Sequence, residues 1–95
     1  MKVLIDDATL GDLAGIYVWI ADESPASAAS VLDRIFSAIE RLGRLPHIGH
    51  AGRVKDTFEW VVSGYSYVIV YELDRSSDSL IVIGVFSSAQ EIRRA

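Results

Sequence analysis

The sequence predicts an α+β domain in which a hairpin of two helices packs on one face of a mostly antiparallel, four-stranded sheet. Apolar residues recur at steps of three and four between residues 10 and 42, which is the spacing of helices. Between residues 57 and 86, short runs rich in β-branched and aromatic residues are separated by turn-forming residues, which is the pattern of strands. With a further short strand at 2–5, the expected order is β-α-α-β-β-β in a single domain covering residues 1–95.

The first helix is expected to be capped by Thr9, because Asp12 follows three residues later, where a capping box has its acid. Gly15 lies inside this helix, where glycine costs about 1 kcal/mol relative to alanine. Such a glycine is tolerated most easily where another backbone approaches closely. The apolar face of this helix is formed by Leu10, Leu13, Ile16, Tyr17 and Ile20.

The second helix is expected to start with Ser24 as its cap and Pro25 in its first turn, and to end at Gly43, shortly before Pro46. The short link between the helices predicts an antiparallel hairpin that must lay its apolar stripe on another element. That stripe contains Ala28, Val31, Leu32, Ile35, Ile39 and Leu42.

Three strands are expected at 57–62, 67–73 and 80–86. The strand at 80–86 is apolar on both faces, so it is expected to lie centrally under the helices. Because one helical hairpin covers only one face of a sheet, apolar residues on the other face predict a surface that needs a partner.

Composition limits what those partners are. Zero cysteines exclude a disulfide framework, a thiolate metal site and a cysteine nucleophile. A net charge of −4 argues against direct, sequence-specific DNA binding, which needs clustered Lys and Arg. No apolar run approaches the ~20 residues of a membrane helix, and the N-terminus does not match a signal peptide. We therefore expect a cytoplasmic protein with no membrane partner.

Motifs for a metal, a cofactor or a nucleophilic triad are missing from the sequence. His47 and His50 lie three apart in one loop, but no third histidine or cysteine exists to complete a metal site. Neither a Gly-x-Ser-x-Gly turn nor a glycine-rich phosphate loop occurs. We expect no metal and no cofactor.

A basic segment runs from residue 41 to residue 55, which contains no acid. Such a patch on an acidic protein can dock a carboxylate-rich partner or a few phosphates. The alternative is a solvated loop whose charges keep the protein soluble. The four cations of this basic patch are Arg41, Arg44, Arg53 and Lys55.

The order of several motifs resembles one family. Asp12-Leu13 with Ile16, Trp19 and Ile20, then Ala28-Ala29, are followed by Pro46-x-x-Gly49-x-x-Gly52-Arg53-Val54-x-x-Thr57-x-Glu59-Trp60-Val61-Val62, by Tyr67-Val68-Ile69-Val70-Tyr71 and by Ala89-Gln90. Over nearly its whole length the chain resembles the RelE/ParE superfamily of toxins from type II toxin–antitoxin systems, and is closer to the ParE branch.

The resemblance implies a small toxin that is neutralised by an antitoxin. The expected antitoxin is ParD-like, a DNA-binding ribbon-helix-helix protein whose C-terminal segment wraps the toxin. ParE members inhibit DNA gyrase, whereas RelE members cut mRNA on the ribosome.

The residues favour the gyrase inhibitor over the ribonuclease. RelE-like nucleases often carry an arginine in the third strand and many carry a histidine near the chain end, where this chain has Tyr67 and Ser87. A ribonuclease would have to recruit Arg53, Lys55 and Glu59. Further departures are Phe58 and His50 in place of arginine and Asp56 in place of glycine. A degenerate toxin that only binds its antitoxin stays an alternative.

Candidate antitoxin contacts come from two surfaces. Exposed members of the hairpin and apolar residues on the uncovered sheet face are the natural choices, although ordinary core packing is an alternative for each. The hairpin offers Leu10, Tyr17 and Phe36, and the sheet offers Trp60, Tyr67 and Tyr71.

Overall fold

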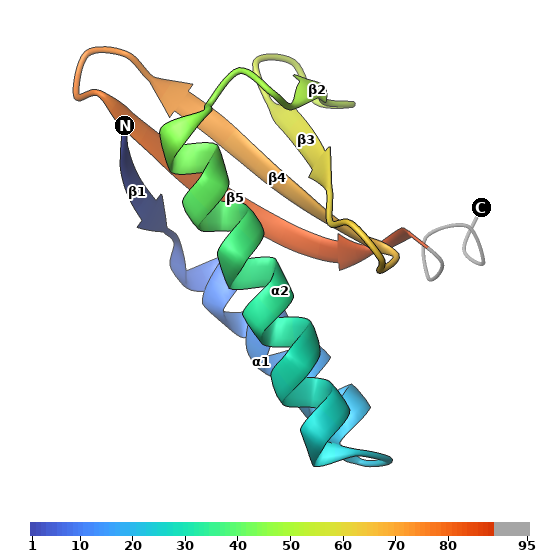
Figure 1. The fold of residues 1–95 in the computed structure, drawn as a ribbon. Helices are drawn as coiled ribbons and strands as arrows, with labels where there is room; N and C mark the ends of the chain where they lie inside the picture. Colours follow the sequence, from blue (N-terminus) through green and yellow to red (C-terminus); the bar gives the residue numbers. More distant parts are fainter. Residues whose placement is uncertain (89–95) are drawn as a thin grey trace.

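A computed structural model describes residues 1–88 and confirms the α+β class and the expected order of helices and main strands (Figure 1). Its strands lie in the order β1-β5-β4-β3-β2; β1 is parallel to β5 and the other neighbours are antiparallel. The sheet has five strands rather than the expected four, because a two-residue strand, too short to leave a pattern, pairs with β3. The elements are β1 (Lys2–Ile5), α1 (Asp7–Ala21), α2 (Pro25–Arg44), β2 (His50–Ala51), β3 (Phe58–Val61), β4 (Tyr67–Asp74) and β5 (Ser79–Ser87).

Helix α1 starts earlier than expected, and the prediction of Thr9 as its cap is wrong. Asp6 is the N-cap, and its carboxylate accepts hydrogen bonds from the backbone N–H (2.8 Å) and the hydroxyl (2.7 Å) of Thr9. These bonds hold the pKa of Asp6 below its ordinary value. Thr9 is fully buried, and its hydroxyl also donates to the carbonyl oxygen of Val82 at 3.0 Å, so it joins the helix to β5.

Asp12 does not complete a capping box. Its carboxylate accepts a hydrogen bond from the backbone N–H of Val85 at 3.1 Å. The pairing of β1 with β5 ends at Val82, so the edge of β5 beyond that point lacks a neighbouring strand on this side. Asp12 therefore satisfies an edge N–H group that β1 is too short to reach.

Helix α2 follows the prediction at its start and along its buried face, but not at its end. Ser24 accepts a hydrogen bond from the N–H of Ser27, and Pro25 occupies the first turn. The helix continues through Gly43 to Arg44, because Val3 packs against Gly43 and the terminal amino group of Met1 donates to the Gly43 carbonyl (2.9 Å).

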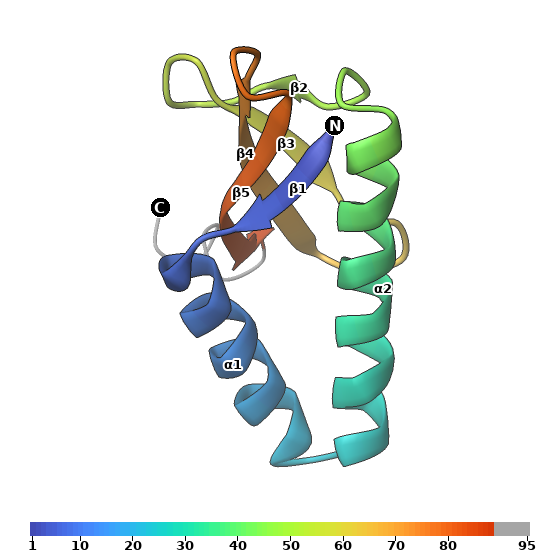
Figure 2. The ribbon, with the colours of Figure 1, turned by 90° about the vertical axis from the view of Figure 1, so that its left-hand side faces the viewer.

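The two helices meet at the short connection between Ala21 and Pro25 and diverge toward the sheet. Figure 2 shows α2 running along one side of the sheet, while α1 starts from the end of β1 and the tip of the hairpin projects away. The molecule is elongated as a result, with extents of 43 × 28 × 24 Å. Among the described residues, no helix is both long enough and apolar enough to cross a membrane. The core joins residues of both helices and the sheet: Leu13, Val31, Ile35, Ile39, Leu42, Val62, Ile69, Tyr71, Leu80, Val82 and Val85.

The strand register reverses the expected assignment of the sheet faces. Residues directly opposite in an antiparallel pair share a face, and Trp60 lies opposite Ile69, which is a core residue. Tyr71 belongs to the same core, and Tyr67 packs against it. The prediction that Trp60, Tyr67 and Tyr71 lie on the uncovered face is therefore wrong.

The other side of the sheet, here called the open face, carries a different set of residues. Glu59 lies opposite Val70 there, and Val61 lies opposite Val68. Beyond Val70 a β-bulge shifts the register of β5, so that Val70 pairs with Gly84 whereas Tyr71 pairs with Val82. The open face includes Leu4, Glu59, Val61, Val68, Val70, Glu72, Ile81, Gly84 and Phe86.

Candidate functional site

Tyr71 fixes the loop that leads from α2 to β3. Its hydroxyl donates a hydrogen bond to the Pro46 carbonyl (2.9 Å) and accepts one from the Gly49 N–H (3.2 Å). A side chain at Gly49 would overlap the Tyr71 hydroxyl, which explains the glycine there. Burial raises the pKa of the Tyr71 phenol, and the Gly49 N–H opposes this in part. Tyr71 is 0% exposed, so it has no surface to offer a partner.

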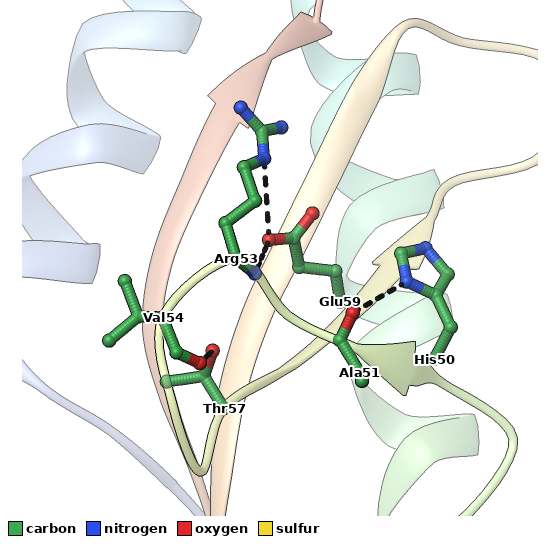
Figure 3. Close-up of polar contacts among 6 residues, drawn as sticks. All are labelled: His50, Ala51, Arg53, Val54, Thr57 and Glu59. Atoms are coloured by element: carbon green, nitrogen blue, oxygen red, sulfur yellow. Dashed lines mark hydrogen bonds and ion pairs between the residues drawn. The ribbon is translucent and has the colours of Figure 1, made fainter.

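Beyond this anchor the chain forms a tight turn at residues 52–57 (Figure 3). The N–H of Gly52 donates to the Thr57 carbonyl (2.8 Å), and the Thr57 hydroxyl donates to the Val54 carbonyl (2.6 Å). Asp56 takes a left-handed conformation with φ of 64°, which favours glycine. The turn leaves Val54 and Lys55 exposed and brings Arg53 to the open face.

Arg53 and Glu59 form the most organised polar cluster of this region (Figure 3). The Glu59 carboxylate accepts a hydrogen bond from the backbone N–H of Arg53 (3.0 Å) and lies 3.6 Å from its Nε. The Arg53 guanidinium is centred 5.0 Å from the middle of the Phe86 ring, a cation–π contact. Glu59 is buried with 7% exposure, whereas the Arg53 side chain is 57% exposed. The cluster therefore presents a cation and an aromatic ring, with the carboxylate beneath them.

The structure joins only part of the residue set that a ribonuclease would recruit. Arg53 and Glu59 touch, but Lys55 lies in the exposed turn and forms no ion pair with Glu59 in the described part of the chain. The six-residue separation of Arg53 and Glu59 gave no sign of their contact, because the turn at residues 52–57 brings them together.

The predicted basic patch divides between two elements. Arg41 and Arg44 belong to the last turn of α2, and Arg44 pairs with Glu40 at 3.7 Å. Arg53 and Lys55 belong to the turn before β3, where Arg53 pairs with Glu59. Because two of the four cations have carboxylate partners, the patch is less cationic than its sequence suggests.

The apolar candidates on the hairpin are exposed, as antitoxin contact requires. Leu10 is 52% exposed, Tyr17 42% and Phe36 44%. Val18 and Trp19 on α1 are more exposed than these three residues, and the sequence did not single them out as contacts. The available signal was that α1 is apolar around most of its circumference, which no single buried stripe explains.

The sheet candidates lie closer to the core. Trp60 and Tyr67 are partly buried against it on the helix-covered face, and burial raises the pKa of Tyr67. Residues 1–88 contain no group of three or more His, Cys, Asp or Glu side chains that could hold a metal ion. His50 instead places its Nδ1 3.1 Å from the Ala51 carbonyl oxygen (Figure 3).

Residues 3–92 match the family described as the ParE toxin of the type II toxin–antitoxin system parDE. The chain belongs to the ParE toxin family. The fold and the order of motifs agree with this assignment, although the Ala89-Gln90 motif lies outside the described residues. A curated relative of this ParE-family toxin is "Putative toxin Y4kP" of Sinorhizobium fredii, 35% identical over 68 residues that cover 72% of this chain and 71% of the relative.

Solved structures show the same fold at low identity. The ParE-family toxin superposes on a chain of the chromosomal ParDE system from P. aeruginosa with a TM-score of 0.79 and 12% identity, covering 92% and 95% of the two chains. It also superposes on the isolated E. coli RelE toxin with a TM-score of 0.68 and 14% identity, covering 98% and 96%. Because both branches share the fold, the fold does not distinguish inhibition of gyrase from cleavage of mRNA.

Proposed function

We propose that this ParE-family toxin inhibits DNA gyrase by binding it and is neutralised by a ParD-like antitoxin. In this proposal the antitoxin is a ribbon-helix-helix protein whose C-terminal segment wraps the toxin. The family match supports a toxin of this type, and solved relatives include the intact E. coli RelBE toxin–antitoxin complex, which has a TM-score of 0.68. The exposed apolar residues of the hairpin are consistent with such a partner.

The state of Glu59 is the observation that carries the choice of a non-catalytic function. A general base needs a carboxylate within reach of the proton that it removes. Glu59 is almost fully buried, and its contacts with the Arg53 backbone and guanidinium hold the turn at residues 52–57. Tyr67, at the position where RelE-like nucleases often carry arginine, packs on the opposite, helix-covered face. These positions favour a structural role for both residues.

A supercoiling assay with purified gyrase tests the proposal. We expect the wild-type toxin to inhibit supercoiling and the cognate antitoxin to restore it. Glu59→Gln keeps a hydrogen-bond acceptor for Arg53, so it should leave the inhibition within about threefold of wild type if Glu59 has no chemical role. No inhibition by saturating wild-type toxin would contradict the proposal.

The second candidate is a ribosome-dependent endoribonuclease, and the Arg53–Phe86 contact favours it. An exposed guanidinium over an aromatic ring can bind a phosphate or stack on a base. Primer extension on mRNA after induction would then show discrete cuts that Glu59→Gln abolishes. Antitoxin binding without either activity would point to a degenerate toxin.

A further inference from the structure

Strand β1 forms one edge of the sheet, and half of its backbone groups point away from the other strands. The sheet order places β5 on one side of β1 and, within residues 1–88, no strand on the other. The N–H groups of Lys2 and Asp6 donate to carbonyl oxygens on the β5 side, at N···O distances of 2.9 and 3.2 Å. Because alternate residues of a strand paired in parallel direct their backbone groups to opposite edges, those of Val3 and Ile5 point outward. Figure 2 looks onto this edge.

The residues of this strand are complementary to a second copy of the same strand running in the opposite direction. Lys2 supplies a positive charge at the start, Asp6 supplies a negative charge just beyond the end, and the residues between them are apolar. If two copies pair antiparallel with Leu4 opposite Leu4, each Lys2 lies opposite Asp6 of the other copy. Val3 lies opposite Ile5 in the same register, so the outward N–H and C=O groups of both residues find partners across the edge.

This register also buries apolar surface on both faces of the sheet. Leu4 is 44% exposed on the open face, where it would meet Leu4 of the other copy. Val3 and Ile5 pack against the core on the helix-covered face, so their contact across the edge would extend that core. A slip by one residue would place Val3 opposite Leu4, whose backbone groups are directed toward β5. The backbone pattern, the apolar contacts and the charges therefore favour the same register.

The alternative role for Lys2 is protection of the edge, since a lysine on an edge strand can prevent pairing with another chain. Here the carboxylate of Asp6 provides a partner for that charge. Both hydrogen bonds from Thr9 to this carboxylate go to the same oxygen, Oδ1. Its Oδ2 can therefore accept a hydrogen bond from Lys2 of a second copy, which changes the lysine from a repulsive group into an attractive one.

We propose that two copies of the toxin pair edge to edge through β1, antiparallel about a twofold axis at Leu4, and form one continuous sheet. The inference does not depend on the proposed function, because the partner is a second copy and the argument uses β1 alone. Opposite residues of an antiparallel pair share a face, so the open faces of both copies lie on the same side of the dimer. The dimer thus presents two Arg53–Phe86 clusters in one direction. The contact is short, so the dimer is weak and reversible.

A cysteine at the axis tests the register directly. The chain contains no cysteine, so Leu4→Cys introduces a single thiol. Two such residues would have their Cα atoms about 4.5 Å apart, within the range of roughly 4.4–6.8 Å that a disulfide spans. Oxidised glutathione should therefore convert this variant to a covalent dimer. The matched control Val61→Cys is 51% exposed on the same face but lies three strands from β1, so it should cross-link at least about tenfold more slowly. Equal rates, or no covalent dimer of Leu4→Cys, would overturn the proposal.

Sedimentation equilibrium of the purified toxin tests the reversible dimer and its charges. Lys2→Glu would set like charges opposite each other twice, so the dissociation constant of the dimer should rise at least about tenfold. Lys55→Glu makes the same change in the exposed turn before β3 and should leave the dissociation constant unchanged. Added salt should weaken the wild-type dimer.

Two further results separate the possible failures. An unchanged melting temperature of Lys2→Glu, measured where the wild type is monomeric, would show that the variant is folded. A wild-type toxin that stays monomeric up to about 1 mM would show that this edge protects itself or serves a different polypeptide, and would overturn the proposal. Equal effects of Lys2→Glu and Lys55→Glu would also overturn it. None of these results bears on gyrase inhibition, which the supercoiling assay tests separately.

Discussion

At the scale of the residue, Tyr71 shows how one side chain organises the loop between α2 and β3. Its ring belongs to the core and stacks against Phe58 at a centroid distance of 5.5 Å, while its hydroxyl bonds to the backbone of Pro46 and Gly49. Tyrosine suits this position because its apolar ring and its polar tip are both satisfied. The sequence revealed the ring but not the partners of the hydroxyl, since these lie 25 and 22 residues away.

Tyr71→Phe should therefore destabilise the toxin by about 1–3 kcal/mol, because it leaves the Pro46 carbonyl and the Gly49 N–H without their partner. Urea unfolding measures the change. Tyr17→Phe is the matched control, since that ring is 42% exposed, and it should change the unfolding free energy by less than about 0.5 kcal/mol. Equal losses in the two variants would contradict the anchoring role.

Asp56 is a second position where one residue's backbone matters. Its φ of 64° lies in the left-handed region, where L-residues other than glycine are disfavoured. Asp56→Gly should stabilise the toxin by up to about 1 kcal/mol in thermal or urea unfolding, and Asp56→Ala should not. A loss of stability in the glycine variant would show that the aspartate side chain contributes more than its backbone conformation costs.

At the scale of the element, predictability followed the strength of the periodic pattern. The buried face and the start of α2 could be predicted because six apolar residues keep one helical period behind a Ser-Pro start. The cap of α1 was missed because Asp6 and Thr9 are both good caps, and only the contact of Thr9 with Val82 distinguishes them. The sheet faces were reversed because β4 is apolar on both sides, so alternation alone does not tell which side the helices cover. The sequence could suggest Glu59 only because a carboxylate can act as a base. Its contact with Arg53 could not be predicted, because that contact depends on the turn at residues 52–57.

Asp12 links two elements, and its removal should weaken that link. Asp12→Ala leaves the edge N–H of Val85 without its acceptor and should cost about 1–3 kcal/mol in urea unfolding. Asp12→Asn retains an oxygen acceptor and should cost less. Asp7→Ala is the control for loss of a negative charge, because Asp7 lies on the same helix and is likewise exposed but is not the acceptor of the Val85 N–H. If Asp7→Ala were as costly as Asp12→Ala, the effect would come from helix electrostatics and not from the strand edge.

At the scale of the whole molecule, the elongated shape separates two surfaces with different chemistry. The open face of the sheet combines Arg53 with Phe86, and the projecting hairpin exposes the apolar, acid-flanked helix α1. If the antitoxin contacts the exposed apolar residues of the hairpin, the open face is the surface left for a second macromolecule. Arg53→Ala should then reduce gyrase inhibition while leaving antitoxin affinity within about twofold of wild type, and Leu10→Ser, at a position that is 52% exposed, should do the reverse. Supercoiling and calorimetry on the same preparations measure both, and a parallel loss in both assays would show that the surfaces are not separate.

Low pH should destabilise the molecule by protonating two carboxylates that accept hydrogen bonds, Asp6 at the start of α1 and Asp74 at the end of β4. Hydrogen bonds from Thr9 lower the pKa of Asp6, and bonds from Ser76 and Ser77 lower that of Asp74. A carboxylate with a lowered pKa stabilises the fold fully above the ordinary Asp value of 3.8, and this contribution is lost as the pH falls through the lower pKa of the folded chain. Urea midpoints of the wild type should therefore decrease below that value. The double variant Asp6→Asn with Asp74→Asn does not titrate at these sites, so its midpoints should decrease less steeply. An identical decrease in the two proteins would assign the acid sensitivity to other carboxylates.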